Sequence, residues 1–359
     1  MKNVLAVALS GGVDSAAAAY ILKQNLKEDT TLIGVSHYIW PESRCCTDSS
    51  MLRANNLCYK LKIPFYKIDL LKDFKNKIVT DFIDNYITGK TPNPCVLCNE
   101  KIRFSIFLSE IEQYIKTNFK TYPDFNLIFS TGHYVRIKLT EQGMFLRKAK
   151  DKAKDQSYML YRLPKKLLHK LIFPLGDYLK SEVIQMAESW GLGMAEIRES
   201  QDACFVDDDY VKFIIEQTGK HELLKVGEII DSEGNVLGKH KGYINYTIGQ
   251  RRGLGLGNGP WYVSRIDPEN NYIVVAREEG LLSSEFTVLN TNWFTDISSK
   301  QVECGVKVRY QSGETPCVIR SDKKSKILKV NLKEPAVITP GQSAVFYDDD
   351  IVLGGGIIV

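Results

Sequence analysis

The sequence predicts an α/β protein: an N-terminal domain built on a parallel sheet, followed by a small β-rich central domain and a C-terminal β-barrel. Strand-like apolar runs alternate with helical patterns through the first half, whereas short strand-like runs separated by turn residues fill the chain from about residue 227. The 359 residues also exceed the ~100–200 of one average domain. We therefore expect three domains, over residues 1–218, 219–283 and 284–359.

In the first half, each strand-like run leads into a helical pattern. Strands that alternate with amphipathic helices are typical of a parallel sheet covered on both faces. The expected strands are 4–9, 31–40, 65–70 and 127–131, the expected helices are 14–23, 48–61, 74–87, 96–111, 165–170, 178–190 and 210–217, and a hairpin-like stretch covers 134–149.

Turn-forming residues divide the second half into short strands. Clusters of Asp, Asn, Ser, Pro and Gly stand at 231–234, 267–270, 311–314 and 348–350. Short alternating strands between such turns indicate all-β structure. The length of this region favours one small module and one barrel over a single sandwich.

The composition excludes several classes of protein. Apolar residues make up 44% of the chain and charged residues 25%, without low-complexity tracts, which excludes disordered and fibrous proteins. No apolar run approaches the ~20 residues of a membrane helix, and no stretch resembles a secretory signal. We therefore expect a cytoplasmic protein without a membrane partner.

The net charge of +4 conceals two basic stretches. Residues 147–170 contain nine Lys and Arg against two Asp, and residues 236–266 contain five Lys and Arg and no acidic residue. Basic stretches with interspersed aromatic and glycine residues suit an RNA backbone and unstacked bases. A solvated charged face is the alternative interpretation.

The eight cysteines, without a secretory signal, predict reduced thiols rather than a disulfide scaffold. Cys58, Cys304 and Cys317 lie in apolar or strand-like contexts and are expected to be small buried residues. Cys45 and Cys46 precede the helix expected at 48–61, and their role stays open.

Cys95 and Cys98 stand at the start of the helical pattern at 96–111. A thiol near a helix N-terminus has its thiolate stabilised by the helix dipole, which suits a nucleophile or a metal ligand. One such pair alone does not decide between a nucleophile and a metal ligand. A zinc site would need two more close ligands, and no second cysteine pair has zinc-finger spacing.

Residues 10–15, Ser-Gly-Gly-Val-Asp-Ser, join the first expected strand to the first expected helix. Glycines permit a tight turn, and the free N–H groups of the helix N-terminus receive an anion. A Walker A loop is a poor match, because the Gly-Lys-Thr at 89–91 has Asp84 where the first glycine belongs. A turn with a serine cap would explain the glycines but not the whole hexapeptide, which looks like the pyrophosphate loop of the N-type ATP pyrophosphatases.

Six further segments follow in order along the chain. They are Thr-Pro-Asn-Pro-Cys-Val-Leu-Cys-Asn at 91–99, Gly-His-Tyr at 132–134, Lys-Asp-Gln-Ser-Tyr at 154–158, Ser-Gln-Asp-Ala-Cys-Phe at 200–205, Gly-Gln-Arg-Arg-Gly-Leu-Gly at 249–255 and Val-Arg-Tyr at 308–310. Together they resemble the tRNA-specific 2-thiouridylases, the MnmA family. The resemblance implies a PP-loop first domain of the adenine nucleotide hydrolase type. It also implies ATP-dependent 2-thiolation of the wobble uridine of tRNA, giving 2-thiouridine, AMP and pyrophosphate.

The resemblance implies that Cys98 is the nucleophile and Cys204 the persulfide carrier, and that Asn93, Pro94 and Cys95 contact the target base. A cysteine can carry a persulfide sulfur that a second cysteine attacks or resolves. Many members of the family have aspartate at the position of Cys95. With cysteine there, a carboxylate general base is not available at that position. As an alternative to the persulfide relay, Cys95, Cys98 and Cys204 together could hold three corners of a [4Fe-4S] cluster that binds hydrosulfide. Both alternatives stay open.

The resemblance also implies the binding residues. ATP, with Mg²⁺, would bind Ala8, Leu9, Ser10, Gly11, Gly12, Val13, Asp14, Ser15, His37 and Gly132. His37 stands where methionine is frequent, so only its backbone is expected to read adenine, and Asp14 is the one suggested metal ligand. The tRNA would contact His133, Lys154, Asp155, Gln156, Arg309, Tyr310 and Gln342.

The expected partners are the anticodon loop of tRNA, with acceptors for Lys, Glu and Gln, and a cysteine desulfurase or sulfur-relay protein. We expect a monomer. Two other functions compete. One is an amidating or ligating ATP pyrophosphatase that acts on a small metabolite, and the other is a non-catalytic RNA-binding or sulfur-carrier protein.

Overall fold

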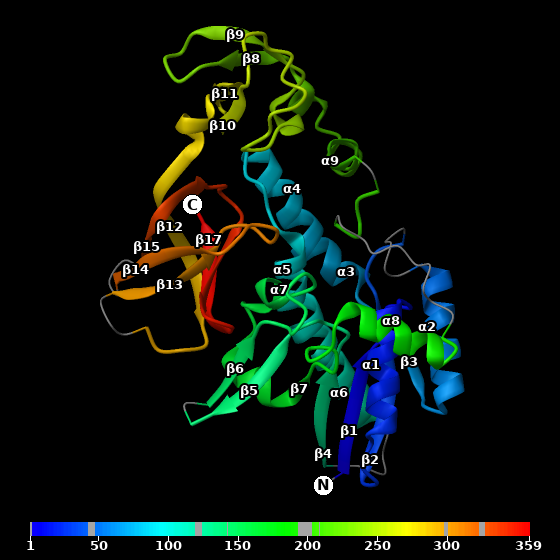
Figure 1. Ribbon diagram of the computed structural model, residues 1–359. Coiled ribbons are helices and arrows are strands. Elements are labelled where there is room, and N and C mark those ends of the chain that lie inside the picture. The colour runs from blue at the N-terminus through cyan, green and yellow to red at the C-terminus, as the bar shows by residue number, and fades with distance from the viewer. Residues whose placement is uncertain are drawn as a thin grey trace. The chain divides into compact units, whose positions relative to one another are not determined.

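The computed structural model describes residues 2–41, 47–118, 124–141, 143–192, 203–207, 209–297, 301–322 and 327–359, without the side chains of 321 and 322. The chain forms two compact units (Figure 1). The first comprises Met1–Ile78, Cys95–Asp207 and Asp350–Val352, and the second comprises Val79–Pro94, Asp208–Asp349 and Leu353–Val359. Cys45 and Cys46 lie outside the described residues.

The first unit contains the parallel sheet that the sequence predicts. Its strands run in the order β3-β2-β1-β4-β7, and every neighbouring pair is parallel. The order reverses beside β1, because β2 and β3 follow on one side of it and β4 and β7 lie on the other. Ligands of open parallel sheets bind at the carboxyl ends of strands at such a switch point. The bounds are β1 (Lys2–Ala8), β2 (Thr30–Tyr38), β3 (Phe65–Asp69), β4 (Phe125–Ser130) and β7 (Leu171–Ile172).

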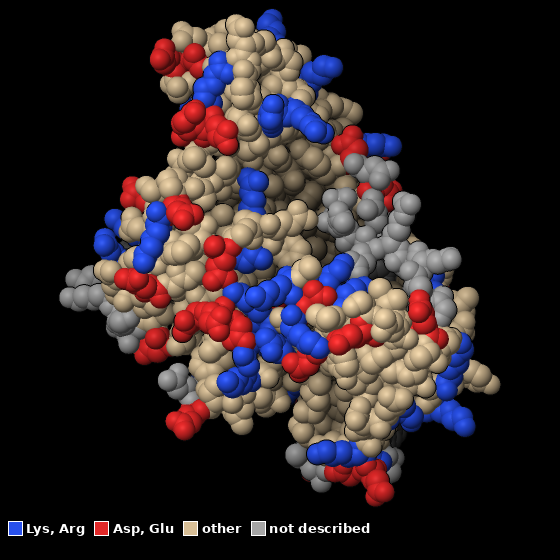
Figure 2. Space-filling view, viewed as in Figure 1, with Lys and Arg blue, Asp and Glu red and all other residues tan. Residues whose placement is uncertain are grey.

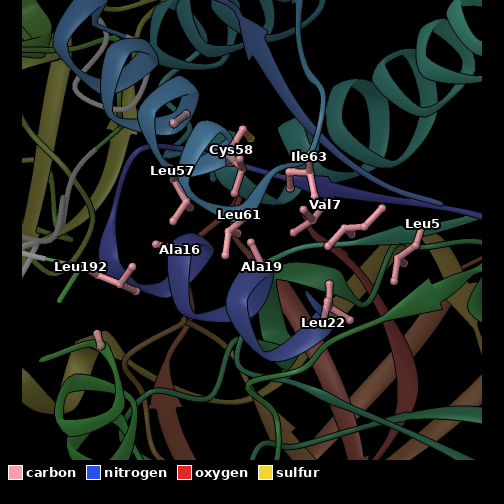
Figure 3. Packing of buried hydrophobic residues seen from close by; sticks show 14 residues of the cluster. Leu5, Val7, Ala16, Ala19, Leu22, Leu57, Cys58, Leu61, Ile63 and Leu192 are labelled. Atoms are coloured by element: carbon pink, nitrogen blue, oxygen red, sulfur yellow. The ribbon is translucent and has the colours of Figure 1, made fainter. Parts of the chain in front are cut away.

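Helices cover both faces of this sheet. Leu5 and Val7 of β1 pack with helices α1 (Val13–Gln24) and α2 (Asp48–Leu61) in one buried cluster (Figure 3). Phe129 of β4 pairs with Ala6 and therefore faces the other side. There it packs at 5.9 Å against Phe107, the first residue of α6 (Phe107–Asn118). The prediction of helices on both faces is confirmed.

Close packing on the α2 side needs a small residue on the sheet. A Cβ at Gly34 would lie 2.3 Å from the Cys58 sulfur. Burial raises the pKa of Cys58 to about 12, so this thiol is a packing group, as predicted.

The remaining helices of the first unit are shorter or irregular. The helix that contains Cys95 and Cys98 continues from α5 (Pro94–Cys98) through a π-helical stretch, η2 (Asn99–Ile106), into α6. The hairpin predicted at 134–149 is present as β5 (Arg136–Thr140) and β6 (Gly143–Arg147). The others are α3 (Leu71–Phe74), η1 (Lys75–Val79), α7 (Ser157–Leu160), η3 (Lys165–Lys170) and α8 (Lys180–Ser189).

The second unit contains a four-stranded sheet in the order β10-β11-β8-β9, with β8 and β11 parallel. Two helices accompany it, α4 (Thr80–Ile87) and α9 (Tyr210–Thr218), whose Tyr86 and Tyr210 rings lie 4.5 Å apart. The other elements are η4 (His221–Leu224), β8 (Gly227–Ile230), β9 (Val236–His240), η5 (Tyr243–Asn245), β10 (Tyr262–Asp267), β11 (Tyr272–Ala276) and η6 (Glu278–Leu281).

The last six strands of the chain form the predicted barrel. They run in the order β12-β15-β14-β13-β16-β17, and the pairing of β12 with β17 closes the ring. Their inward residues, such as Val288, Ile319 and Phe346, form one buried cluster. The bounds are β12 (Leu282–Trp293), β13 (Val302–Lys307), β14 (Thr315–Asp322), β15 (Ile327–Val337), β16 (Ser343–Asp348) and β17 (Ile351–Ile358). Among the described helices, none is long and apolar enough to span a bilayer.

Candidate active site

The loop between β1 and α1 has the geometry of an anion-binding turn. Gly11 has φ +74°, which favours glycine, and Gly12 caps α1 without a side-chain hydrogen bond. The hydroxyl of Ser15 donates to Gly12 O at 2.9 Å and accepts from Ser10 N at 3.2 Å. These bonds fix the shape of the loop and leave the N-terminus of α1 without a side-chain cap, as an anion site requires.

The segment after β4 lies against the first turn of α1. Val7 pairs with Ser130, so the two strands end together. A Cβ placed on Gly132 would lie 2.8 Å from Ser15 N and 2.9 Å from the carbonyl carbon of Asp14. The structure thus brings Gly132 and the loop together, as the sequence predicts, and only glycine allows this approach.

Gly132→Ala is expected to displace the anion-binding loop of residues 10–15, because the atoms that the new Cβ would meet are backbone atoms of this loop. We expect ATP affinity to fall by about tenfold or more, with the loss of one or two anion-binding N–H groups. Isothermal titration with ATP measures this loss. Gly313→Ala is the control, since nothing lies within 4 Å of its Cβ position. Unchanged ATP affinity in Gly132→Ala would contradict the assignment of this loop.

Asp14, the suggested metal ligand, is already engaged in an ion pair. Lys180 Nζ, at the start of α8, lies 2.7 Å from both carboxylate oxygens, and the Tyr134 hydroxyl donates to Oδ1 at 2.7 Å. The side chains of Lys180 and Asp14 are 14% and 28% exposed. In this arrangement Asp14 does not offer a free carboxylate to Mg²⁺. Lys180 was not predicted, because it lies in an ordinary helical pattern.

His37 lies at the carboxyl end of β2, next to Tyr38. Its ring is buried and packs against Phe107, with the ring centroids 5.0 Å apart. The imidazole therefore belongs to the core. The expected backbone contact of His37 with adenine stays a prediction.

The two helical cysteines differ in exposure. Cys95 is exposed in the first turn of α5, where the dipole acts, whereas Cys98 is buried, 9% exposed, at the end of the same turn. The expectation that both lie at the start of the helix is confirmed.

Cys204 lies in a short described segment that is anchored by its neighbour Phe205. The Phe205 ring packs edge-on against Phe74 at 5.4 Å and against Trp40 at 6.5 Å, and Phe205 is buried. Cys204 itself is half-buried. Residues 200–202 of the same motif lie outside the described residues.

No metal-ligand group forms among the described residues. Cys95, Cys98 and Cys204 are all described, and no three His, Cys, Asp or Glu side chains converge there in a way that could hold a metal ion. The three thiols of Cys95, Cys98 and Cys204 therefore do not form a cluster-binding set in this structure.

His133 connects the end of β4 to the cysteine-bearing helix. Arg103 Nη1 lies 3.4 Å from His133 Nε2 and donates to Asn99 Oδ1 at 2.9 Å. Because arginine only donates, Nε2 is the acceptor, and the proton lies on Nδ1 and is donated to Thr131 Oγ1 at 2.7 Å. Burial and the Arg103 charge hold the pKa of His133 well below its usual value, so the ring is neutral. Arg103 was not predicted.

Two of the three tRNA contacts predicted at 154–156 have side chains that form hydrogen bonds inside the protein. Asp155 is buried, and its carboxylate accepts from Ala149 N at 2.9 Å and from the Ser157 hydroxyl at 2.7 Å. Gln156 Oε1 accepts from Tyr134 N at 2.9 Å. Lys154 is half-buried.

Figure 2 shows Lys and Arg side chains gathered in the middle of the face in view, with Asp and Glu among them. Three basic residues of the stretch 147–170 form ion pairs. Arg147 pairs with Asp350, Lys150 with Glu182 and Arg162 with Glu100. The Lys150 pair is exposed, whereas the Arg147 and Arg162 pairs are largely shielded from solvent. Part of this stretch is therefore a paired surface rather than a uniform basic one.

Within the second unit, two predicted tRNA contacts hold neighbouring segments. Arg309 Nη2 donates to Ile248 O at 2.9 Å, and Arg309 Nε donates to Thr339 Oγ1 at 3.1 Å. Gln342 Nε2 donates to Thr91 O at 2.8 Å, at the start of the Thr-Pro-Asn-Pro segment. Tyr310 is half-buried beside Arg309. The structure thus brings Gln342 close to the motif that precedes the cysteines.

Comparison with known proteins covers nearly the whole chain. Three protein-family models match: tRNA methyl transferase HUP domain over residues 2–208, tRNA methyl transferase PRC-barrel domain over 213–277, and Aminomethyltransferase beta-barrel domain over 283–358. A tRNA-specific 2-thiouridylase MnmA 1 from Caldanaerobacter subterraneus subsp. tengcongensis is 42% identical over 372 residues, covering 100% of this chain and 98% of its own. The tRNA-specific 2-thiouridylase MnmA of Geobacter metallireducens is 37% identical, covering 99% and 96%.

A solved structure is also similar, at a lower level. The U34-tRNA thiolase NcsA from Methanococcus maripaludis, with its [4Fe-4S] cluster, shares 19% identity over 62% of this chain and 66% of that chain. The TM-score is 0.34.

Proposed function

Because the chain belongs to the family of the tRNA-specific 2-thiouridylases, MnmA, we propose that it thiolates the wobble uridine of tRNA at C2 with ATP. One observation carries the proposal: the first unit alone contains the anion-binding loop of residues 10–15, with Gly132 against it, and the cysteines 95, 98 and 204. Replacement of oxygen by sulfur needs an activating nucleotide and a sulfur carrier. The loop would bind the nucleotide, and the cysteines would carry the sulfur.

The first step is adenylation of the uracil C2 oxygen. That oxygen attacks the α-phosphorus of ATP, the bond to the β-phosphate breaks, and pyrophosphate leaves. The N–H groups of the loop and the Ser10 hydroxyl receive the phosphates, and the Ser15 hydroxyl holds the loop in shape through its bond to Gly12 O. Ala8 to Ser15, the His37 backbone and Gly132 enclose the nucleotide. The Mg²⁺ that accompanies ATP would offset phosphate charge.

The second step transfers sulfur. The outer sulfur of a Cys204 persulfide attacks C2, AMP leaves, and the Cys98 thiolate then attacks the sulfur of Cys204. The uridine keeps the transferred sulfur, and a disulfide joins Cys98 to Cys204 until a reductant cleaves it. A cysteine desulfurase or relay protein would renew the persulfide.

The tRNA would bind with its wobble base unstacked, which costs a few kcal/mol. Asn93, Pro94 and Cys95 would contact the base, and His133, Lys154, Asp155, Gln156, Arg309, Tyr310 and Gln342 would position the anticodon loop. The neutral His133 ring accepts a hydrogen bond from Arg103 at Nε2 and donates its Nδ1 proton to Thr131. We further propose three domains at 1–218, 219–283 and 284–359, which the ranges of the three family models support.

The test is mass spectrometry of tRNA nucleosides after incubation of the protein with ATP, Mg²⁺ and a sulfide or persulfide donor. We expect 2-thiouridine and one AMP for each sulfur incorporated. Absence of 2-thiouridine under both aerobic and anaerobic conditions would refute the proposal. Pyrophosphate release that needs no tRNA would instead favour an enzyme acting on a small metabolite.

A further inference from the structure

The first turns of α2 pack against the anion-binding loop of residues 10–15. A Cβ on Gly11 would lie 2.4 Å from Ser50 O and 2.8 Å from the Ser50 Cα, so the loop backbone rests on the helix backbone. Thr47 caps this helix and accepts a hydrogen bond from Ser50 N at 3.2 Å. Residues one turn further along α2 are therefore held at the loop.

Arg53 is that residue. Its Nε donates to Gly11 O at 2.9 Å, a contact between residues 42 positions apart. Because the guanidinium is planar and rigid, this bond holds its two terminal amino groups beside the loop. Among the described residues, the four N–H donors of those amino groups have no hydrogen-bond partner, and no carboxylate pairs with Arg53.

The charges around the loop single out this arginine. Two cationic side chains of the described part of the chain form hydrogen bonds with the loop, Arg53 and Lys180. The charge of Lys180 is offset by Asp14. The loop itself supplies N–H groups and hydroxyls but no positive charge, whereas a triphosphate brings several negative charges. Of these two side chains, Arg53 is the one whose charge is left to balance them, in addition to the Mg²⁺ that accompanies ATP.

We infer that the Arg53 guanidinium binds the pyrophosphate part of ATP and retains inorganic pyrophosphate after adenylation. The inference rests on the proposed function, in which this loop receives ATP. Guanidinium groups bind phosphate oxygens through two parallel N–H bonds. Negative charge grows on the leaving pyrophosphate as its bond to the α-phosphorus breaks, so the contact strengthens along the reaction.

The test compares binding of inorganic pyrophosphate by wild type, Arg53→Gln and Arg53→Lys, measured by isothermal titration and by inhibition of tRNA-dependent AMP formation. Glutamine can still donate to Gly11 O but is neutral, so it separates the charge from the structural bond. We expect Arg53→Gln to weaken pyrophosphate binding by about tenfold to a hundredfold. The matched control Lys60→Gln, which removes an exposed cation from the same helix, should leave binding unchanged.

Equal pyrophosphate binding by wild type and a folded Arg53→Gln would overturn the inference and leave the proposed function intact. A wild-type protein that binds neither ATP nor pyrophosphate would overturn both. If Arg53→Gln lacks a cooperative thermal transition, Arg53→Lys decides, because lysine keeps the charge but loses the paired N–H geometry. Wild-type affinity for pyrophosphate in that variant would also contradict the inference.

Discussion

Cys98→Ser is expected to lower the formation of 2-thiouridine by at least ~10³-fold, while ATP and tRNA still bind. A serine hydroxyl is not ionised near neutral pH and does not cleave a persulfide or a disulfide at a useful rate. The exchange removes the thiol and keeps nearly the same volume, so the buried position next to η2 stays filled. Nucleoside mass spectrometry measures the lost product, and a pyrophosphate assay follows the adenylation step.

Cys95→Ser is the informative companion, because Cys95 lies on the same helical turn but is exposed. In the persulfide relay the Cys95 thiol transfers no sulfur, so this variant should keep most of its activity and Cys98→Ser should not. In the cluster mechanism both thiols are ligands, and both variants should lose activity together with iron and acid-labile sulfide. Full activity in Cys98→Ser would refute both mechanisms.

Anaerobic purification separates the two mechanisms without any substitution. Iron and acid-labile sulfide that accompany activity would favour the cluster, even though no three described side chains converge for a metal in this structure. An iron-free and fully active enzyme would exclude the cluster. The persulfide relay predicts this second result, along with an intramolecular disulfide between Cys98 and Cys204 after one turnover.

The parallel sheet and the barrel could be predicted because each follows from a local pattern. Alternation of apolar runs with helices indicates βα units, and turn residues divide β-strands, whatever the neighbours in space. The order of the strands in the sheet could not be predicted from such local patterns. Nothing in the runs at 4–9 and 127–131 indicates that β1 and β4 are adjacent, although this adjacency brings Gly132 to the loop.

Side-chain direction was the other property that local patterns could not give. Asp155 lies in a stretch that reads as basic and RNA-facing, yet its carboxylate is buried and bonds to Ala149 N. The Asp155 carboxylate therefore stabilises the conformation of its own segment and does not face solvent. Charge counts along a chain report composition, whereas burial depends on which elements the fold places around a residue.

The cations at the phosphate loop show the same limit most clearly. Lys180 is 166 residues from Asp14 in the sequence, and Arg53 is 42 residues from Gly11. Neither belongs to a motif, and each reaches the loop through a helix that packs beside it. A sequence motif indicates the backbone that is expected to receive the anion, but the charges around that backbone come from distant elements.

Lys180→Met is expected to weaken ATP binding by about a hundredfold. Lys180 Nζ lies 2.7 Å from both oxygens of Asp14, and removal of this ammonium leaves a partly buried carboxylate without its cation beside the phosphate site. That carboxylate would then repel the triphosphate, and an unpaired, partly desolvated charge of this kind costs about 2–5 kcal/mol. The methionine side chain keeps the apolar length of lysine, so packing at the start of α8 is retained.

The double variant Asp14→Asn with Lys180→Met isolates the electrostatic part of this effect. If repulsion by Asp14 causes the loss, neutralising that carboxylate should recover most of the ATP affinity, measured by isothermal titration without tRNA. Lys150→Met is the matched control, because it breaks an exposed ion pair with Glu182 on the same helix, with side chains 47% and 41% exposed. Exposed pairs contribute about 0–1 kcal/mol, so that variant should bind ATP nearly as wild type does. Equal losses in Lys150→Met and Lys180→Met would show that the Asp14 pair has no special part in nucleotide binding.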